Sequence, residues 1–263
     1  MIGSICGDII GSVHEGAGTK TKDFPLFVED SRFTDDTVLT VAVAARQLSG
    51  SEYVDLFHQY FHAYPLAGYG GTFIEWARQR RRQPYQSWGN GAAMRVSPIG
   101  IACVSLDDVL AEARRSAEVT HDHPEGIRGA QATAAAVFLA RTGASKLNIR
   151  ADIERIFGYD LSMPLADIRD HYRFDISCQG SVPQSIIAFL ESDSYEDAVR
   201  NAISLGGDAD TMAAIAGGIA EAFYGSVPEP IRVRALALLD PPLRAIVDAF
   251  TARFGDRLTK QRT

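Results

Sequence analysis

The sequence predicts an all-α fold. Along most of the 263 residues, apolar side chains recur at spacings of three and four, alanine is abundant, and residues typical of helix starts come just before the apolar runs. Alternating polar and apolar runs, the pattern of a half-buried strand, are almost absent. No internal repeat and no linker rich in Pro or Ser divides the chain, so we expect one domain over residues 1–263.

The first expected helix lies at the beginning of the chain. Gly3, Gly7 and Gly11 recur there every four residues, and a similar set of small residues recurs over 213–220. Such stripes let helix backbones approach each other closely. Asp8 interrupts the apolar stretch and no basic residue precedes it, so the segment is predicted to be neither a signal peptide nor a membrane span.

Six further helices are predicted from the residues at their ends. Three follow a cap residue, and in two of these an Asp three residues later completes a capping box: Thr34 precedes 35–48, Ser105 precedes 106–119, and Ser194 precedes 195–205. Three have glycine or proline at an end: 125–143 closes at Gly143, 210–225 ends at Gly225 before Pro228, and 241–254 begins with Pro. We expect loops near 16–32, 64–72, 82–100 and 143–180.

The charge and the cysteine content exclude several classes of protein. With 26 Lys and Arg against 33 Asp and Glu, the net charge is -7, and the one basic run, 78–82 (RQRRR), is typical of a solvated helix end. No stable nucleic-acid partner is therefore expected. Cys6, Cys103 and Cys178 have no CxxC spacing, so they encode neither a disulfide framework nor a zinc knuckle, and they favour a reducing, cytoplasmic location.

Two short segments concentrate carboxylates at helix starts, 34–37 (TDDT) and 206–211 (GGDADT). Capping a helix needs one acceptor side chain, whereas each segment supplies two carboxylates and hydroxyls, and neighbouring carboxylates repel each other unless a cation lies between them. Oxygen ligands without His or Cys suit Mg²⁺, Mn²⁺ or Ca²⁺ better than zinc. From the residues alone, capping and cation binding both stay open.

Two glycine-rich stretches, 68–72 and 87–95, are candidates for phosphate binding. They offer backbone N–H groups and small side chains, and Tyr69 and Trp88 lie within them to face a base or a sugar. Neither stretch is a Walker loop or a GxGxxG motif after a strand, so turn formation is the simpler explanation of these glycines.

Other catalytic arrangements find less support in the sequence. A zinc site would need histidines that converge, and Gln59 stands where a zinc protease needs a glutamate. No GxSxG motif marks a serine nucleophile, and the apolar surroundings of Cys6 and Cys103 raise a thiol pKa. The histidines that a single zinc ion would have to gather are His58, His62, His121 and His123.

Taken together and in order, these segments resemble those of the ADP-ribosylglycohydrolase family. The resemblance implies a compact, single-domain orthogonal bundle of helices with a binuclear magnesium centre, in which Mn²⁺ can stand for Mg²⁺. The matching motifs are GDIIGSVHEG (7–16), FTDDTVLT (33–40), GYGGTFIEW (68–76), SWGNGAAMRVSPIG (87–100), THDHPEGIRGAQATA (120–134) and SLGGDADTMAAIAGGIAEAFYG (204–225).

The resemblance also implies the site residues. Glu15 matches a glutamate that faces the metals in the serine-type branch and is implicated in catalysis, while Asp35 is a weaker candidate because a ligand carboxylate is poorly free to move protons. A tyrosine often occupies the position of Trp88, and His123 has no assigned counterpart. The matched metal ligands are Thr34, Asp35, Asp36, Asp208, Asp210 and Thr211. The matched ligand contacts are Gly70, Gly71, Ser87, Trp88, Gly89, Asn90, Gly91 and His121, of which 87–91 holds the diphosphate and the neighbouring ribose.

The implied activity is hydrolysis of the glycosidic bond between ADP-ribose and a modified acceptor, with a protein side chain such as arginine or serine expected. The expected partner is ADP-ribose or an ADP-ribosylated protein. Two other functions stay open: a protein that binds ADP-ribose without cleaving it, and a Mg²⁺-dependent hydrolase of a nucleotide diphosphate. The acceptor linkage, the physiological target and the oligomeric state do not follow from the sequence.

Overall fold

Helices account for the regular structure of the computed structural model, which describes residues 1–259. Within this range no strand forms, and one isolated bridge joins Gly89 to Ser177. The all-α prediction is therefore confirmed. No helix in the described part of the chain is both long and apolar enough to cross a membrane.

The helices follow one another with short connections, apart from the long segment between the first two. In chain order they are α1 (Ile2–Gly11), α2 (Asp35–Ser49), α3 (Tyr53–Ala63), α4 (Gly71–Arg78), the short 3₁₀ helix η1 (Asn90–Ala92), α5 (Ser97–Ala102), α6 (Leu106–Glu118), α7 (Pro124–Arg141), α8 (Lys146–Phe157), α9 (Leu165–His171), α10 (Cys178–Leu190), α11 (Tyr195–Ile203), α12 (Ala209–Tyr224), α13 (Glu229–Leu236), α14 (Pro241–Phe254) and α15 (Asp256–Thr259).

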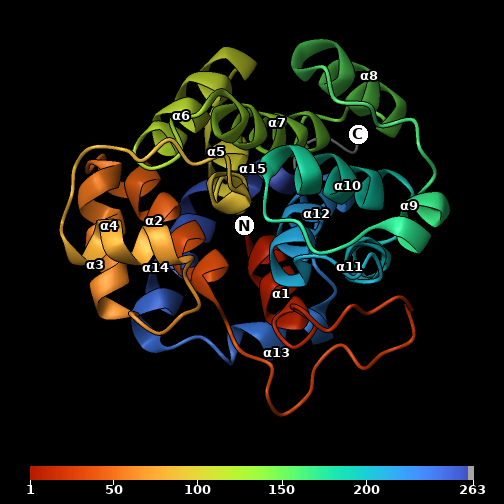
Figure 1. The fold of residues 1–263 in the computed structure, drawn as a ribbon, viewed down its shortest axis with the longest axis horizontal. Coiled ribbons are helices and arrows are strands. Elements are labelled where there is room, and N and C mark those ends of the chain that lie inside the picture. The colour runs from red at the N-terminus through yellow and green to blue at the C-terminus, as the bar shows by residue number, and fades with distance from the viewer. Residues whose placement is uncertain (260–263) are drawn as a thin grey trace.

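Helices α1 and α12 pack against each other at the centre of the molecule (Figure 1). A Cβ added to Gly7 would lie 2.1 Å from the carbonyl oxygen of Ala213, and one added to Gly11 would lie 2.5 Å from the Cα of Asp210. The two backbones are therefore in contact, as the small-residue stripes predict, because only glycine fits between them. This contact fixes the start of α12 beside the end of α1.

The remaining helices surround this pair. Helices α2 to α4 lie on one side and α9 to α11 on the other, with α5 to α7 along the top of the view in Figure 1. Their apolar faces form one continuous core. Fully buried members of that core include Ile5, Ile9, Val38, Val41, Phe57, Val137, Val182 and Ile219.

The helix starts predicted from cap residues are confirmed. The Thr34, Ser105 and Ser194 side chains accept hydrogen bonds from backbone N–H groups in the first turns of α2, α6 and α11. Gly225, in the left-handed conformation with φ of 88°, ends α12 as expected.

The loop predicted over 143–180 is wrong, because this stretch contains α8, α9 and the beginning of α10. Helix α8 buries only Ile149, Ile153 and Phe157, a stripe too narrow to stand out among the polar residues around it. Helix α10 contains Pro183, a residue that usually ends a helix. The loop regions near 64–72 and 82–100 also contain the start of α4, the helix η1 and the start of α5, whereas 16–32 contains no helix.

Candidate active site

The starts of α2 and α12 meet beside the end of α1. Thr34 caps α2 and Asp36 lies in its first turn, while Asp208 stands just before α12 and Asp210 lies in the first turn of that helix. The Thr211 hydroxyl donates a hydrogen bond to Oδ2 of Asp36 (3.1 Å), which joins two segments 175 residues apart in the chain. The two acidic segments therefore form one site.

Asp8 of α1 holds the start of α2 in place. Its buried carboxylate accepts hydrogen bonds from the N–H and the hydroxyl of Thr34 (3.0 and 2.7 Å) and from the N–H (3.1 Å) and the hydroxyl of Thr37. The sequence patterns predict no functional role for Asp8. The available signal was a lone charged residue beside Gly7 in an otherwise apolar helix.

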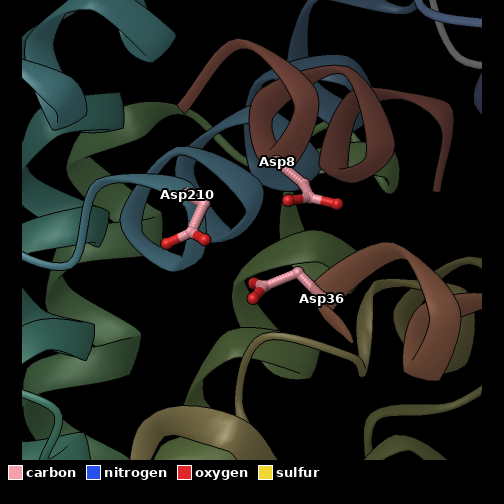
Figure 2. Close-up of side chains that lie close together, drawn as sticks. All are labelled: Asp8, Asp36 and Asp210. Carbon is pink, nitrogen blue, oxygen red and sulfur yellow. The ribbon is translucent and has the colours of Figure 1, made fainter. Parts of the chain in front are cut away.

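Five carboxylates gather at this junction. Figure 2 shows Asp8, Asp36 and Asp210 around one space, each on a different helix, and one oxygen from each lies within 4.8 Å of the others. Glu15, Asp208 and Asp210 form a second group by the same measure. Because Asp210 belongs to both groups, we describe these five residues together as the acidic site.

The electrostatics of the acidic site favour a bound cation. Burial raises the pKa of Asp36 and of Asp210 well above the usual range, and each is raised further by neighbouring carboxylates. Asp35 beside the site is raised well above its usual pKa for the same two reasons, with Asp8 and Asp208 as its main neighbours. Protonation is one way to relieve this repulsion, and a divalent cation is the other.

A buried oxygen without a hydrogen-bond partner is a second observation that favours a bound cation. Oδ1 of Asp36 is buried and has no hydrogen-bond partner among the described residues, although buried carboxylate oxygens are normally paired. The donors around it are carboxylate and hydroxyl oxygens, which are the ligands that Mg²⁺ and Mn²⁺ prefer. The residues present therefore fit a divalent metal.

Glu15 differs from the other members of the acidic site because it is exposed to solvent. It lies in the turns that follow α1. Partial desolvation and the charge of Asp208 raise the pKa of its carboxyl, and Arg32 lowers it. A carboxylate with access to water and a raised pKa is suited to accept a proton.

A cavity of ≈ 320 Å³ adjoins the acidic site. Gly70 and Gly71, at the start of α4, line it, and a Cβ added to either would meet no atom within 4 Å. The loop 87–91 lines another part, and there Nδ2 of Asn90 donates a hydrogen bond to Oδ2 of Asp208 (2.8 Å). The glycine-rich loop is thus tied directly to the carboxylates.

All of the predicted site residues except Trp88 line this cavity. Trp88 is 54% exposed, and its ring packs edge-on against His123 with ring centroids 5.6 Å apart. The structure therefore places Trp88 on the surface beside the cavity. The roles of the residues that do line it, as metal ligands or substrate contacts, stay predictions.

Other candidate groups do not form a second catalytic site. Nε2 of His58 bonds to the carbonyl oxygen of Arg81 (2.8 Å), and His123 caps α7 by accepting from the N–H of Glu125 (3.1 Å). Among the described residues, no group placed to hold a metal contains a histidine. Burial raises the pKa of the Cys103 thiol to about 11, which disfavours a thiolate nucleophile.

The basic run 78–82 lies at the end of α4. Arg81 pairs with Glu75 at 3.0 Å and Arg82 pairs with Asp55, all with half-exposed side chains. Part of its positive charge is therefore matched by neighbouring acids, as in a solvated helix end.

The comparisons with known proteins find a family and relatives that are named as ADP-ribosyl hydrolases. The model of the ADP-ribosylglycohydrolase family matches residues 1–259. The chain is 28% identical over 311 residues to the ADP-ribosylhydrolase ARH3 of Homo sapiens, with 87% of this chain and 86% of the relative covered. It is 24% identical over 268 residues to the ADP-ribosylarginine hydrolase Tri1 of Pseudomonas putida, with 86% and 69% covered.

A solved structure shows the same similarity in three dimensions. A chain of an ADP-ribosylglycohydrolase-related protein complex superposes with a TM-score of 0.67 at 25% sequence identity. The superposition covers 95% of this chain and 96% of that one. The match therefore extends over nearly the whole of both chains.

Proposed function

Because the chain belongs to the ADP-ribosylglycohydrolase family, we propose that it is a Mg²⁺-dependent hydrolase that releases ADP-ribose from a modified protein side chain, either arginine or serine. The observation that carries the proposal is the acidic site, in which carboxylates from three helices meet beside a cavity lined by two glycine-rich loops. One relative is itself named as an ADP-ribosylarginine hydrolase.

We assign two magnesium ions to this site, and Mn²⁺ fits the same oxygen ligands. When bound, the ions supply positive charge that orients the ribose hydroxyls and acidifies a nearby water. Asp8 is kept apart from this set, because its oxygens already accept hydrogen bonds from the start of α2. The proposed ligands are Thr34, Asp35, Asp36, Asp208, Asp210 and Thr211, all of which line the cavity.

In the proposed reaction, Glu15 is the residue that accepts a proton. Glu15 takes a proton from a water molecule as the water oxygen attacks the anomeric carbon of the ribose. The bond from that carbon to the acceptor oxygen or nitrogen breaks through an oxocarbenium-like transition state. The bonding electrons leave with the acceptor, which takes up a proton from water, and Glu15 returns to water the proton that it had accepted. Asp35 is a weaker candidate for the base, because a carboxylate that holds a metal ion is poorly free to move protons.

The two glycine-rich loops bind ADP-ribose in this proposal. Gly70 and Gly71 carry no side chain, so ADP-ribose can approach the cavity wall closely there. The loop 87–91 and His121 face its diphosphate. Product and partner are therefore ADP-ribose, free or attached to protein. A cytoplasmic location, which the three free cysteines favour, stays a prediction.

The decisive experiment replaces Glu15 by Gln. We expect Glu15→Gln to bind Mg²⁺ as the wild type does and to lose roughly a hundredfold or more in kcat, because a general base contributes about 10²–10⁴-fold. Free ADP-ribose is measured by chromatography and mass spectrometry after incubation with arginine- and serine-linked ADP-ribosyl peptides. The matched control is Glu52→Gln, which changes an exposed glutamate outside the cavity.

The products separate the alternatives. Free ADP-ribose that disappears when a chelator is added supports the proposal. AMP together with a ribose phosphate would show a nucleotide diphosphate hydrolase, and tight binding of ADP-ribose without any product would show a non-catalytic binding protein. Wild-type turnover by Glu15→Gln with its metals bound would remove Glu15 from the mechanism.

A further inference from the structure

Arg95 is a fully buried cation beside the cavity. Its side chain lines the cavity wall, yet no carboxylate of residues 1–259 forms an ion pair with it. Its guanidinium lies over the ring of Phe57 at 4.2 Å, and its Nε and Nη1 atoms have no hydrogen-bond partner in this range. Burial lowers its pKa only to about 10, so the charge is retained at neutral pH. An unpaired buried charge is costly and calls for an explanation.

One of the two hydrogen bonds that Arg95 donates leads to His121. Its Nη2 atom donates to the carbonyl oxygen of Ser116 (2.7 Å) and to the hydroxyl oxygen of Thr120 (3.0 Å). That hydroxyl lies 2.7 Å from Nδ1 of His121. Both Thr120 and His121 are buried, so water does not compete for these bonds.

The chemistry of the hydroxyl sets the direction of this chain of bonds. Thr120 accepts from a guanidinium, which makes its own proton a better donor and its oxygen a poorer acceptor. Because the Thr120 oxygen accepts from Arg95, its own proton is available for the 2.7 Å contact with Nδ1 of His121.

The other ring nitrogen faces the loop 87–91. A Cβ added to Gly89 would lie 3.5 Å from Nε2 of His121, and one added to Gly91 would lie 3.3 Å from it. The two glycines therefore keep the space beside this nitrogen free of side chains. Burial and the charge of Arg95 both lower the pKa of His121 well below its usual range, so its ring is neutral at physiological pH.

We propose that Arg95 and Thr120 are positioning residues that hold His121 as the tautomer with its proton on Nε2, aimed at the diphosphate of the bound ligand. A diphosphate only accepts hydrogen bonds, so the opposite tautomer would present a lone pair to it and repel it. The buried charge of Arg95 adds an attractive potential behind the donor. This inference rests on the proposed function, because it takes ADP-ribose as the ligand.

The test reads the tautomer directly. In the full chain with Mg²⁺ and ¹⁵N-labelled histidine, long-range ¹H–¹⁵N correlation spectra distinguish the protonated from the unprotonated ring nitrogen, and His121→Gln identifies the His121 signals. We expect the proton on Nε2 in the wild type. Thr120→Val removes the hydroxyl and keeps the shape, so we expect mixed tautomers and roughly tenfold weaker binding of ADP-ribose by calorimetry. Thr120→Ser should restore both.

Kinetics adds a second readout. Because the contact is to the diphosphate and not to the reacting carbon, Thr120→Val should raise KM several-fold more than it lowers kcat. The proposal is overturned by a proton on Nδ1 in the wild type, which needs no variant, or by a folded Thr120→Val that keeps the Nε2 proton and wild-type affinity. Tautomer and affinity are measured without turnover, so a chain that binds ADP-ribose in this way but releases no product contradicts only the proposed function.

Discussion

At the scale of single residues, Asp8 determines how the acidic site is built. One carboxylate accepts bonds from two backbone N–H groups and two hydroxyls of the residues that begin α2. It therefore does for α2 what a cap residue does, but from another helix. The same carboxylate adds a negative charge next to Asp35 and Asp36, and so raises the pKa of both.

Two substitutions at Asp8 separate these effects. Asp8→Asn and Asp8→Ala both remove the charge, so the difference between them isolates the hydrogen bonds. Asn keeps a carbonyl oxygen for the N–H groups of Thr34 and Thr37, whereas Ala leaves these buried donors without a partner. We expect Asp8→Ala to have a free energy of unfolding about 2 kcal/mol below that of Asp8→Asn, measured by urea denaturation in chelator. Equal stabilities would show that only the charge of Asp8 matters.

Residue chemistry could be predicted only in part. The excess of carboxylates at 34–37 and 206–211 is visible in the sequence, since one acceptor suffices for a cap. The role of Asp8 is not visible in the sequence, because it depends on which helix end packs against α1. The ligand contact of Trp88 stays a prediction: it rests on the motif, while in the structure the ring packs on His123 and does not line the cavity.

At the scale of helices, the contact between α1 and α12 places the site. The Cα of Asp210 lies against Gly11, so the separation of the two helices decides where the α12 carboxylates stand relative to Asp8. Any side chain at the contact would push against backbone atoms, which cannot move aside as a flexible side chain can.

Gly7→Ala tests this dependence. The new methyl group would lie 2.1 Å from the carbonyl oxygen of Ala213, and we expect a loss of about 3 kcal/mol in the free energy of unfolding from overpacking. The control is Gly71→Ala at the start of α4, where the methyl group meets no atom within 4 Å and a gain of about 0.5–1 kcal/mol is expected. The measurement is the urea concentration at the midpoint of unfolding for the two variants and the wild type. A midpoint of Gly7→Ala at or above that of the wild type would contradict the tight contact.

Helices were predictable where their ends carry a local signal. Thr34, Ser105 and Ser194 cap through their own side chains, so sequence alone identifies the starts they make. Helix α10 was missed because its stability comes from burial against α7, α11 and α12, which outweighs the cost of Pro183. Tertiary packing of this kind leaves no trace at short range.

At the scale of the whole molecule, the meeting of the two acidic segments is a property of the fold. Helical periodicity predicts helices but not which helix ends adjoin, so capping and cation binding could not be separated from the residues alone. The order of the motifs along the chain carried that information, since it matched a family whose model covers residues 1–259. The structure then joins Asp36 to Thr211 directly.

The acidic site makes the stability of the molecule depend on pH and metal together. Its buried aspartates have pKa values above the ordinary value of about 4 in the unfolded chain. The folded apo-protein therefore binds more protons than the unfolded chain, so its stability falls as pH rises from about 4 through these raised values. Metal binds the deprotonated carboxylates, so its stabilisation grows over the same range.

We therefore expect thermal melts in chelator to give a melting temperature that decreases between pH 5 and pH 8, and melts in Mg²⁺ to remove most of that decrease. At a free concentration of about 100 times Kd, each ion adds about 2.7 kcal/mol. Sodium chloride at matched ionic strength controls for screening, and Asp36→Asn with Asp210→Asn should flatten the slope in chelator and abolish the response to Mg²⁺. Parallel pH profiles with and without Mg²⁺ in the wild type would mean that the carboxylates are not held together by a cation.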